Sequence, residues 1–371
     1  MSKTFDVCIR GDGVVGRTMA LLLAKERLRV ALVTSVIAPP GDADAAQDVR
    51  AYALNSTSKK LLDGLRVWPG ADLATPVSTM QVWGDDGGAV NFDAVAAGQE
   101  ALAWIVDVPA LEQNLLDACR FQSQIETVSE PAQATLTVIC EGQASSSRAL
   151  TAQWSRKSYA QKAMAARLTS RVPHGAAARQ WFAGGDVLAL LPTGGAGGNS
   201  MALVWSVSGD RSDALSQLPS AEFCSAISAV CGERVGHLEL ISKISSWPLA
   251  LSKAEHWVGS GWALAGDAAH TVHPLAGQGL NLGLADAACL ASVLAAREYW
   301  RGLGDEKLLR RYERARKAEV AAVSTVTDGL QNLFAQTGAP WQSLRNLGMN
   351  GFSANQPLKN WLTRRAAGVS N

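Results

Sequence analysis

The first 33 residues carry the pattern that most restricts how this chain can fold. The apolar run Phe5–Ile9 predicts a buried strand, and a glycine-rich turn, Gly11–Gly16, follows it directly. Met19–Lys25 has the apolar spacing of a helix, and Val30–Val33 predicts a second strand parallel to the first. The turn reads G-x-G-x-x-G, in which bare backbone lets a pyrophosphate approach the N-terminus of a helix. This segment therefore predicts an α/β fold that binds a dinucleotide.

A second glycine-rich segment, Ala263–Gly283, reads ALAGDAAHTVHPLAGQGLNLG. The apolar run Trp262–Ala265 before it predicts a short buried strand. Gly266 and Asp267 stand at the end of that strand, where a carboxylate could accept a hydrogen bond from a ligand hydroxyl. A helix that favours negative charge at its start is expected to follow. It opens with Gly277, Gly279 and Gly283.

Composition and spacing exclude several classes of function. His270 and His273 are spaced like metal ligands, but Pro274 interrupts a helix there and no third ligand is evident, so we predict no metal site. A net charge of +1 gives no reason to expect nucleic acid as a partner. We see no apolar run of membrane-spanning length and no signal peptide. The six cysteines include no Cys-x-x-Cys pair, which favours a reducing, cytoplasmic location.

Together the two glycine-rich segments resemble the FAD-dependent aromatic hydroxylases of the para-hydroxybenzoate hydroxylase type, and within them the ubiquinone-biosynthesis hydroxylases. The resemblance runs from about Phe5 to about Gly368 and is most specific in Ala263–Gly283. Other segments appear in the order typical of that family, namely residues 50–55 (RAYALN), 104–107 (WIVD), Leu111-Glu112, 141–148 (EGQASSSR), Tyr159 with Gln161, His174, 180–182 (QWF) and 188–192 (LALLP).

The resemblance implies an α/β architecture in which an FAD-binding, Rossmann-like domain of the glutathione-reductase type is interleaved with a β-sheet substrate domain and followed by C-terminal helices. We expect the FAD-binding domain to be discontinuous, comprising residues 1–75, 101–157 and 249–304. We expect the substrate domain over residues 76–100 and 158–248, and a C-terminal helical segment over 305–371.

The resemblance also implies the site. FAD is expected as cofactor, with NAD(P)H or another reductant as electron donor and O2 as co-substrate. One oxygen would reach the aromatic ring through a flavin hydroperoxide, so no catalytic side chain is assigned with certainty. His273, Pro274, Pro192 and Trp205 are expected near the flavin ring or substrate, although Pro192 and Trp205 could equally be packing residues. The expected cofactor-binding residues are Gly11, Gly13, Val14, Val15, Gly16, Thr34, Arg50, Arg148, Gly266, Asp267, Pro274, Gly277, Gln278, Gly279 and Leu280.

Three departures from the family pattern leave alternatives open. Thr34 stands where an acid usually binds the adenosine ribose, Glu141 replaces an aspartate, and the region from Leu115 to Val138 is short. The leading prediction is hydroxylation of a polyprenyl phenol of ubiquinone biosynthesis. The alternatives are hydroxylation of a soluble aromatic compound, or a non-catalytic accessory protein of the ubiquinone pathway with weakened FAD binding.

The predicted partner is an apolar, prenylated phenol. The C-terminal segment Gly338–Asn371 has basic residues, three spaced aromatics and no acid, a composition that could favour an anionic membrane surface or an acidic partner as well as simple packing onto the body. Peripheral contact with the inner membrane or with a complex of the ubiquinone pathway is therefore a second expectation beside the cytoplasmic location.

Overall fold

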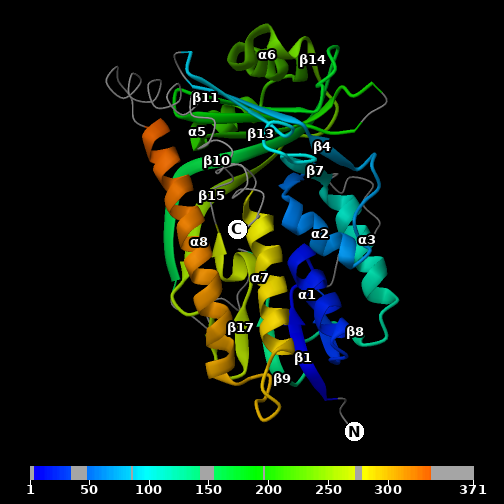
Figure 1. The fold of residues 1–371 in the computed structure, drawn as a ribbon. Helices are drawn as coiled ribbons and strands as arrows, with labels where there is room; N and C mark the ends of the chain where they lie inside the picture. Colours follow the sequence, from blue (N-terminus) through cyan, green and yellow to red (C-terminus); the bar gives the residue numbers. More distant parts are fainter. Residues whose placement is uncertain are drawn as a thin grey trace.

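The computed structural model describes residues 4–34, 48–84, 87–142, 154–194, 197–271 and 278–335. Figure 1 shows two halves stacked one above the other: a lower half with α1, α7 and α8 around a parallel sheet, and an upper half built on a broad sheet capped by α6. The chain passes between the halves several times, because segments of both halves alternate along the sequence.

The lower half is organised around a six-stranded sheet in the order β16-β17-β9-β1-β2-β8. Its neighbouring strands are parallel except for the antiparallel pair β16–β17. The apolar side chains of β1 and of the second half of β9 are buried, as is usual for parallel sheets covered on both faces. The strands are β1 (Phe5–Arg10), β2 (Val30–Val33), β8 (Ile125–Val128), β9 (Ala134–Ile139), β16 (Val258–Gly259) and β17 (Trp262–Leu264).

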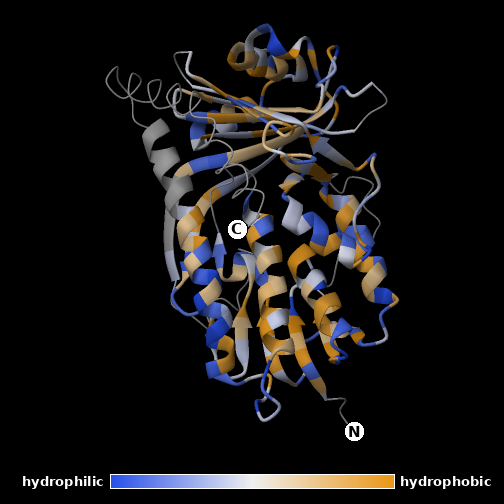
Figure 2. Ribbon diagram, viewed as in Figure 1, coloured by the Kyte–Doolittle hydropathy of each residue, from blue (hydrophilic) through white to orange (hydrophobic). Residues whose placement is uncertain are grey.

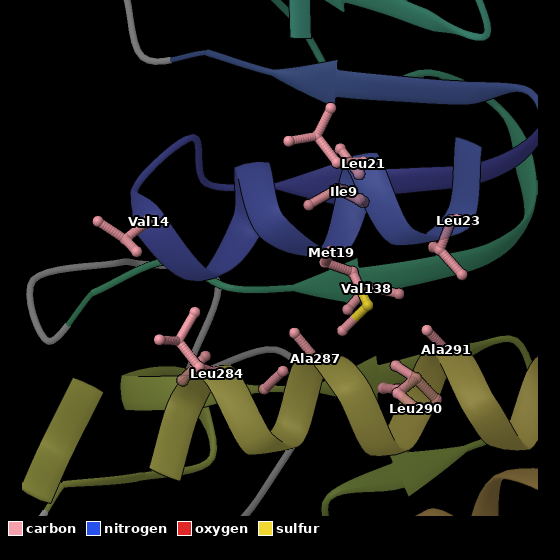
Figure 3. Close-up of a cluster of buried hydrophobic side chains, with 14 of the residues drawn as sticks. Ile9, Val14, Met19, Leu21, Leu23, Val138, Leu284, Ala287, Leu290 and Ala291 are labelled. Carbon is pink, nitrogen blue, oxygen red and sulfur yellow. The ribbon is translucent and has the colours of Figure 1, made fainter. Parts of the chain in front are cut away.

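Helices α1 (Val14–Lys25) and α7 (Gln278–Ala295) pack against each other over this sheet. In Figure 3, Met19 and Leu23 of α1 lie toward α7, where Ala287 and Ala291 present small side chains that allow close approach. Helix α3 (Val108–Arg120) packs on the other side of α1, and α8 (Glu306–Ala335) on α7. These contacts form the largest apolar core of the protein.

Helix α7 is, among the described residues, the single helix long and apolar enough by composition to cross a membrane. Half of it is buried inside the protein, where α1 and α8 cover it. Figure 2 shows the same contrast, since α1 and α7 are largely hydrophobic while α8 carries many hydrophilic residues. The apolar composition of α7 is therefore explained by its place in the core.

A three-stranded antiparallel sheet in the order β3-β7-β4 joins the two halves. It contains β3 (Ala51–Leu54), β4 (Ala74–Val77) and β7 (Ala103–Asp107), with α2 (Ser56–Gly64) directly after β3. The side chains of Ala51, Val77 and Ile105 form a small apolar cluster with Ala178 and Ala202 of the upper sheet. This cluster fixes how the upper half sits on the lower one.

The upper half is a nine-stranded sheet in the order β18-β15-β10-β13-β12-β11-β5-β6, with β14 also paired to β10. Its far face packs on α6, and Met164, Leu203, Trp205 and Phe223 are buried in the core between them. The elements are β5 (Thr79–Trp83), β6 (Ala89–Asp93), β10 (Trp154–Ser170), β11 (Ala177–Ala183), β12 (Asp186–Pro192), β13 (Ser200–Ser208), α5 (Gly209–Ser216), α6 (Ser220–Cys231), the 3-10 helix η1 (Gly232–Val235), β14 (Leu238–Leu240), β15 (Ser245–Ala254) and β18 (His270–Thr271).

Most of the predicted strands and helices are present, and the predicted α/β fold class is confirmed. The strand predicted over residues 238–244 is wrong in its extent, because pairing with β10 ends at Leu240 and a separate long strand begins at Ser245. The division into domains stays a proposal. Two features bear on its boundaries: β10 begins at Trp154, and α8 packs directly on the core helix α7.

Candidate cofactor and substrate site

The glycine turn after β1 is built to leave space at the start of α1. Gly11 has φ +104°, a backbone conformation that favours glycine. A Cβ on Gly16 would lie 1.9 Å from the Gly11 carbonyl oxygen, so the turn closes only with glycine there. A Cβ on Gly13, in contrast, would meet nothing within 4 Å. The backbone at Gly11 thus favours glycine, Gly16 has no room for a side chain, and Gly13 opens onto free space.

The start of α1 is suited to a phosphate group. Its N-cap, Gly13, provides no side-chain hydrogen bond, and the first turn has no acidic residue. Helix N-terminal N–H groups and the helix dipole favour an anion at such a place. The residues present therefore fit the pyrophosphate of FAD, with Val14, Val15 and Gly16 in the first turn.

The second glycine-rich segment converges on the same turn. Gly266 has φ +63°, and a Cβ there would lie 3.4 Å from the Val15 side chain. A Cβ on Gly283 of α7 would lie 2.7 Å from Val15 Cγ2 and 3.4 Å from the Gly266 Cα. Val15, Gly266 and Gly283 therefore pack together without room for larger residues. The ends of α1, β17 and α7 meet at one place, as the two glycine motifs predict.

Asp267 is exposed and lies in the 3-10 helix η2 (Gly266–Ala268) that follows β17. Its charge acts on Tyr52 of β3: burial raises the pKa of the Tyr52 phenol, the Arg50 guanidinium lowers it, and the Asp267 carboxylate raises it again. Asp267 is therefore near enough to Tyr52 for its charge to act on the phenol, and it stays open to solvent. A carboxylate so placed can accept hydrogen bonds from ligand hydroxyls.

Asn281 connects the start of α7 to β3. Its Oδ1 accepts hydrogen bonds from Asn55 N at 3.0 Å and Ser58 Oγ at 2.7 Å. Its Nδ2 donates to Ala53 O at 2.8 Å. One buried side chain therefore fixes the position of α7 against the end of β3 and the start of α2. Sequence analysis did not identify Asn281, because a lone asparagine in an apolar helix gives no sign of a distant partner.

Arg50 is held by acids in this structure. Its Nη2 lies 2.6 Å from Asp48 Oδ2 and 3.5 Å from Glu112 Oε1. The pKa of Asp48 is raised by burial but lowered more by Arg50, and lies below its ordinary value. Arg50 directly precedes β3, and its charge acts on Tyr52 of that strand, as does that of Asp267. A role for Arg50 toward FAD therefore stays a proposal.

A cavity of about 430 Å³ lies between the three-stranded sheet and the nine-stranded sheet. Arg167 of β10 crosses from the upper sheet: its Nη2 donates to Asp107 Oδ2 at 2.8 Å and to Arg50 O at 3.0 Å. Asp48, Asp72 and Asp107 also line it, and most of the remaining lining residues are apolar or small. They include Val49, Leu73, Ile105, Leu168, Met201 and Ile241. An aromatic ring with an apolar substituent fits a cavity of this character.

His174 fixes the loop on the upper rim of this cavity. Its Nδ1 accepts a hydrogen bond from Ala176 N at 3.0 Å, so its Nε2 donates to Thr193 O at 2.9 Å. Burial lowers the pKa of this histidine and favours its neutral form. Thr193 and Gly194 line the first cavity and also an adjoining one of about 540 Å³. His174 therefore positions the cavity wall by holding a backbone carbonyl.

The remaining predicted site residues are placed as follows. Gln278, Gly279 and Leu280 form the first turn of α7, and Thr34 directly follows β2. Pro192 is buried at the end of β12, next to Thr193 of the cavity wall. Arg148, His273, Pro274 and Gly277 lie outside the described residues.

Trp205 requires a correction. It is fully buried on the far face of the upper sheet, where its ring lies 6.3 Å from that of Phe223 on α6. Ala202, three residues earlier in β13, belongs instead to the cluster with Ile105 of the three-stranded sheet, because strand side chains alternate between faces. The prediction that Trp205 lies near the flavin ring is therefore wrong. An apolar strand buried on both faces does not reveal which residues face the cofactor.

These features define a dinucleotide-binding flavoprotein with a second, sheet-based domain. Among the described residues no group of three or more His, Cys, Asp or Glu side chains could hold a metal ion. The chain belongs to the FAD binding domain family, whose sequence profile matches residues 116–327. The resemblance recognised from the glycine motifs, the FAD cofactor and the oxidoreductase class are thereby confirmed.

Individual relatives agree with this assignment. The chain is 29% identical to the ubiquinone hydroxylase UbiL of Rhodospirillum rubrum, an alignment that covers 99% of this chain and 90% of that one. It is 28% identical to the 3-demethoxyubiquinol 3-hydroxylase of Escherichia coli, over 98% of both chains. The crystal structure of PqsL, a probable FAD-dependent monooxygenase of Pseudomonas aeruginosa, shares the fold with a TM-score of 0.75 at 19% identity, covering 94% of this chain and 100% of that one. The protein is an FAD-dependent monooxygenase.

Proposed function

We propose that this monooxygenase hydroxylates the aromatic ring of a polyprenyl phenol in ubiquinone biosynthesis. The observation that carries the proposal is the mainly apolar cavity between the two sheets, whose lining includes Asp48, the ion-pair partner of Arg50. The names of the full-length relatives, a ubiquinone hydroxylase and a demethoxyubiquinol hydroxylase, supply the substrate class.

The chain's own residues would divide the work of holding FAD. The N-terminus of α1 and the turn Gly11–Gly16 would bind the pyrophosphate, and Asp267 would accept hydrogen bonds from the ribitol. The first turn of α7, from Gln278, would face the pyrimidine edge of the ring, where the helix dipole favours negative charge. Bound FAD, once reduced by NAD(P)H or another donor, supplies the chemistry that activates O2 and transfers one oxygen atom to the ring.

The substrate would lie in the cavity between β7 and β10. Val49 and Ile105 stand in the apolar wall of the cavity, and the exposed side chains of Leu73 and Ile241 extend that apolar surface to the rim, where a prenyl tail could leave the cavity. Arg167 is neutralised by Asp107 and hydrogen-bonded to Arg50 O, so it is held as part of the wall. The cavity is thus suited to hold a neutral aromatic ring between the two sheets.

Both alternatives from the sequence lack comparable support. A soluble aromatic substrate would not need the partly exposed apolar rim, and a non-catalytic accessory protein would not need an open space at Gly13 or an uncapped α1 N-terminus. The short loop between α3 and β9 still contains β8, which pairs with β2, so the parallel sheet keeps its edge strand. The departure in length therefore leaves the cofactor sheet complete around β1.

A prenylated substrate is stored in lipid, so we also propose that the protein works in the cytoplasm and at the periphery of the inner membrane, or in a complex of the same pathway. The basic, aromatic segment Gly338–Asn371 that motivates this location lies outside the described residues. Binding to anionic liposomes, compared between the full chain and one that ends at residue 337, would test it. Equal binding by the two folded proteins would contradict it.

The function is tested by deleting the gene and identifying the accumulated quinone precursor by mass spectrometry. Expression of the intact gene should restore a product one oxygen atom heavier. The purified protein, supplied with FAD, a reductant and that precursor, should give the same product. Accumulation of no prenylated phenol, or turnover of a soluble aromatic compound in preference to the prenylated one, would contradict the proposal.

A further inference from the structure

A cluster of buried charged side chains lies directly beneath the loop that carries Asp267. Asp286 of α7 is fully buried, and His270 and Arg316 are each only 3% exposed. Asp286 Oδ1 accepts a hydrogen bond from Arg316 Nε at 2.7 Å. Asp286 Oδ2 accepts from Gly266 N at 2.9 Å and lies 2.8 Å from His270 Nε2. We call these three residues the Asp286 cluster.

The Asp286 cluster connects three elements that are distant in sequence. His270 lies on β18, Asp286 on α7 and Arg316 on α8. Arg316 also forms an ion pair with Glu319 and donates to Leu282 O at 3.3 Å. The His270 ring stacks on Trp257, with centroids 5.0 Å apart. Each member is therefore fixed from more than one side.

Stability alone does not account for such a group. Taking three charged or polar side chains out of water costs free energy, and apolar residues of similar volume often stabilise a core equally well. Burial raises the pKa of Asp286, but His270 and Arg316 lower it more, so the carboxyl stays ionised. A buried carboxylate that is kept charged must contribute something that an apolar side chain could not.

That contribution is visible in the backbone. The same oxygen, Asp286 Oδ2, binds the first residue of the segment Gly266–His270 through its N–H and the last through its ring. Gly266, whose φ is +63°, makes this contact, and Asp267 is the next residue. Asp286 does not reach the space in which FAD would lie. It fixes both ends of the short loop that does.

We propose that Asp286 is a positioning residue for the cofactor loop: together with His270 it holds Gly266–His270 in the conformation that directs Asp267 toward FAD, and Arg316 transmits the position of α8 to that loop. The expected effect of Asp286 on FAD affinity rests on the proposed contact between Asp267 and FAD. Its effect on loop order can be measured without the cofactor.

The test compares Asp286→Asn with Leu294→Ala. Leu294 is fully buried two turns further along the same helix, so its truncation should destabilise the protein without touching the loop. In the apoprotein, amide hydrogen exchange of residues 266–270 should be about tenfold faster or more in Asp286→Asn than in Leu294→Ala. Fluorescence titration at a temperature where both variants are folded should show an FAD dissociation constant raised about tenfold in Asp286→Asn and little changed in Leu294→Ala.

His270→Gln provides a second variant in case Asp286→Asn does not fold, because it leaves the Asp286–Arg316 pair intact. It should also speed exchange of the loop and weaken FAD binding. Unchanged hydrogen exchange of residues 266–270 in Asp286→Asn and His270→Gln would overturn the proposal. A loss of FAD affinity in Leu294→Ala as large as that in Asp286→Asn would overturn it as well. Normal FAD affinity in Asp267→Ala combined with fast exchange in Asp286→Asn would refute the role of Asp267 and leave the loop-ordering role of Asp286 standing.

Discussion

Replacing Asp267 by alanine should weaken FAD binding while leaving the fold unchanged. Asp267 is exposed at the end of β17, so its removal uncovers no core. A carboxylate that accepts a ribitol hydroxyl makes a charge-assisted hydrogen bond, which contributes about 1.5–3 kcal/mol. Since about 1.4 kcal/mol corresponds to a factor of ten, one such bond predicts a dissociation constant raised by about ten- to a hundredfold.

The assay is titration of the apoprotein into FAD, followed by quenching of flavin fluorescence. Asp267→Asn keeps an acceptor oxygen but loses the charge, and should lie between the wild type and Asp267→Ala. Asp117→Ala is a control, because Asp117 is a half-exposed aspartate on α3, paired with Arg120 and away from the glycine turns. It should bind FAD as the wild type does. An unchanged dissociation constant in Asp267→Ala would mean that Asp267 only caps the turn after β17.

Three further predictions follow from the same geometry. Gly16→Ala should lose FAD binding together with about 1–3 kcal/mol or more of stability, because its Cβ would lie 1.9 Å from a backbone oxygen. Gly13→Ala should keep a normal thermal unfolding midpoint and only weaken FAD binding, because its Cβ would meet nothing within 4 Å. Equal thermal midpoints for the two variants would contradict this reasoning. Thr34→Glu should tighten FAD binding in the same titration by adding a charged acceptor after β2, and no gain would mean that another residue binds the ribose. The pKa of Asp286 is lowered in the folded protein. The stability that this carboxylate contributes is therefore present above its pKa in the unfolded chain, about 3.9, and is lost as the pH falls toward its pKa in the folded protein. Chemical denaturation from pH 7 to pH 3 should show this loss of stability, and a much smaller loss in Asp286→Asn.

The cofactor half of the fold could be predicted because its signals are local. The spacing of glycines in Gly11–Gly16 and the apolar periodicity after Gly279 depend on neighbours within a few residues. Both helices are present, although α1 begins at Val14, five residues before the predicted start at Met19. Gly266 and Gly283 could be assigned to one site for the same reason, although their contact with Val15 is visible only in three dimensions.

The rest of the site depends on partners that sequence distance conceals. Asn281 binds the backbone near residue 55, and Asp286 pairs with Arg316, yet all three appear in the sequence as ordinary polar residues of long helices. Trp205 failed for another reason: β13 is buried on both faces, so hydrophobicity does not indicate which side faces the cofactor. The sequence feature that could have indicated these contacts is a polar residue within an apolar helix, because a buried polar group needs a hydrogen-bond partner.

The strand order of the lower sheet has a consequence for how the protein is made. β9 pairs on one side with β1 and on the other with β17, which leaves the ribosome only after the whole upper sheet up to β15 has been synthesised. Until then the nascent chain has an open edge at β9 and the uncovered apolar face of α1 that α7 will later bury. Such non-local pairing folds slowly and exposes surfaces that aggregate. We therefore expect the emerging chain to require protection by chaperones, and FAD to bind only after α7 has been synthesised, because the site combines the turn Gly11–Gly16 with the distant segment Gly266–Gly283.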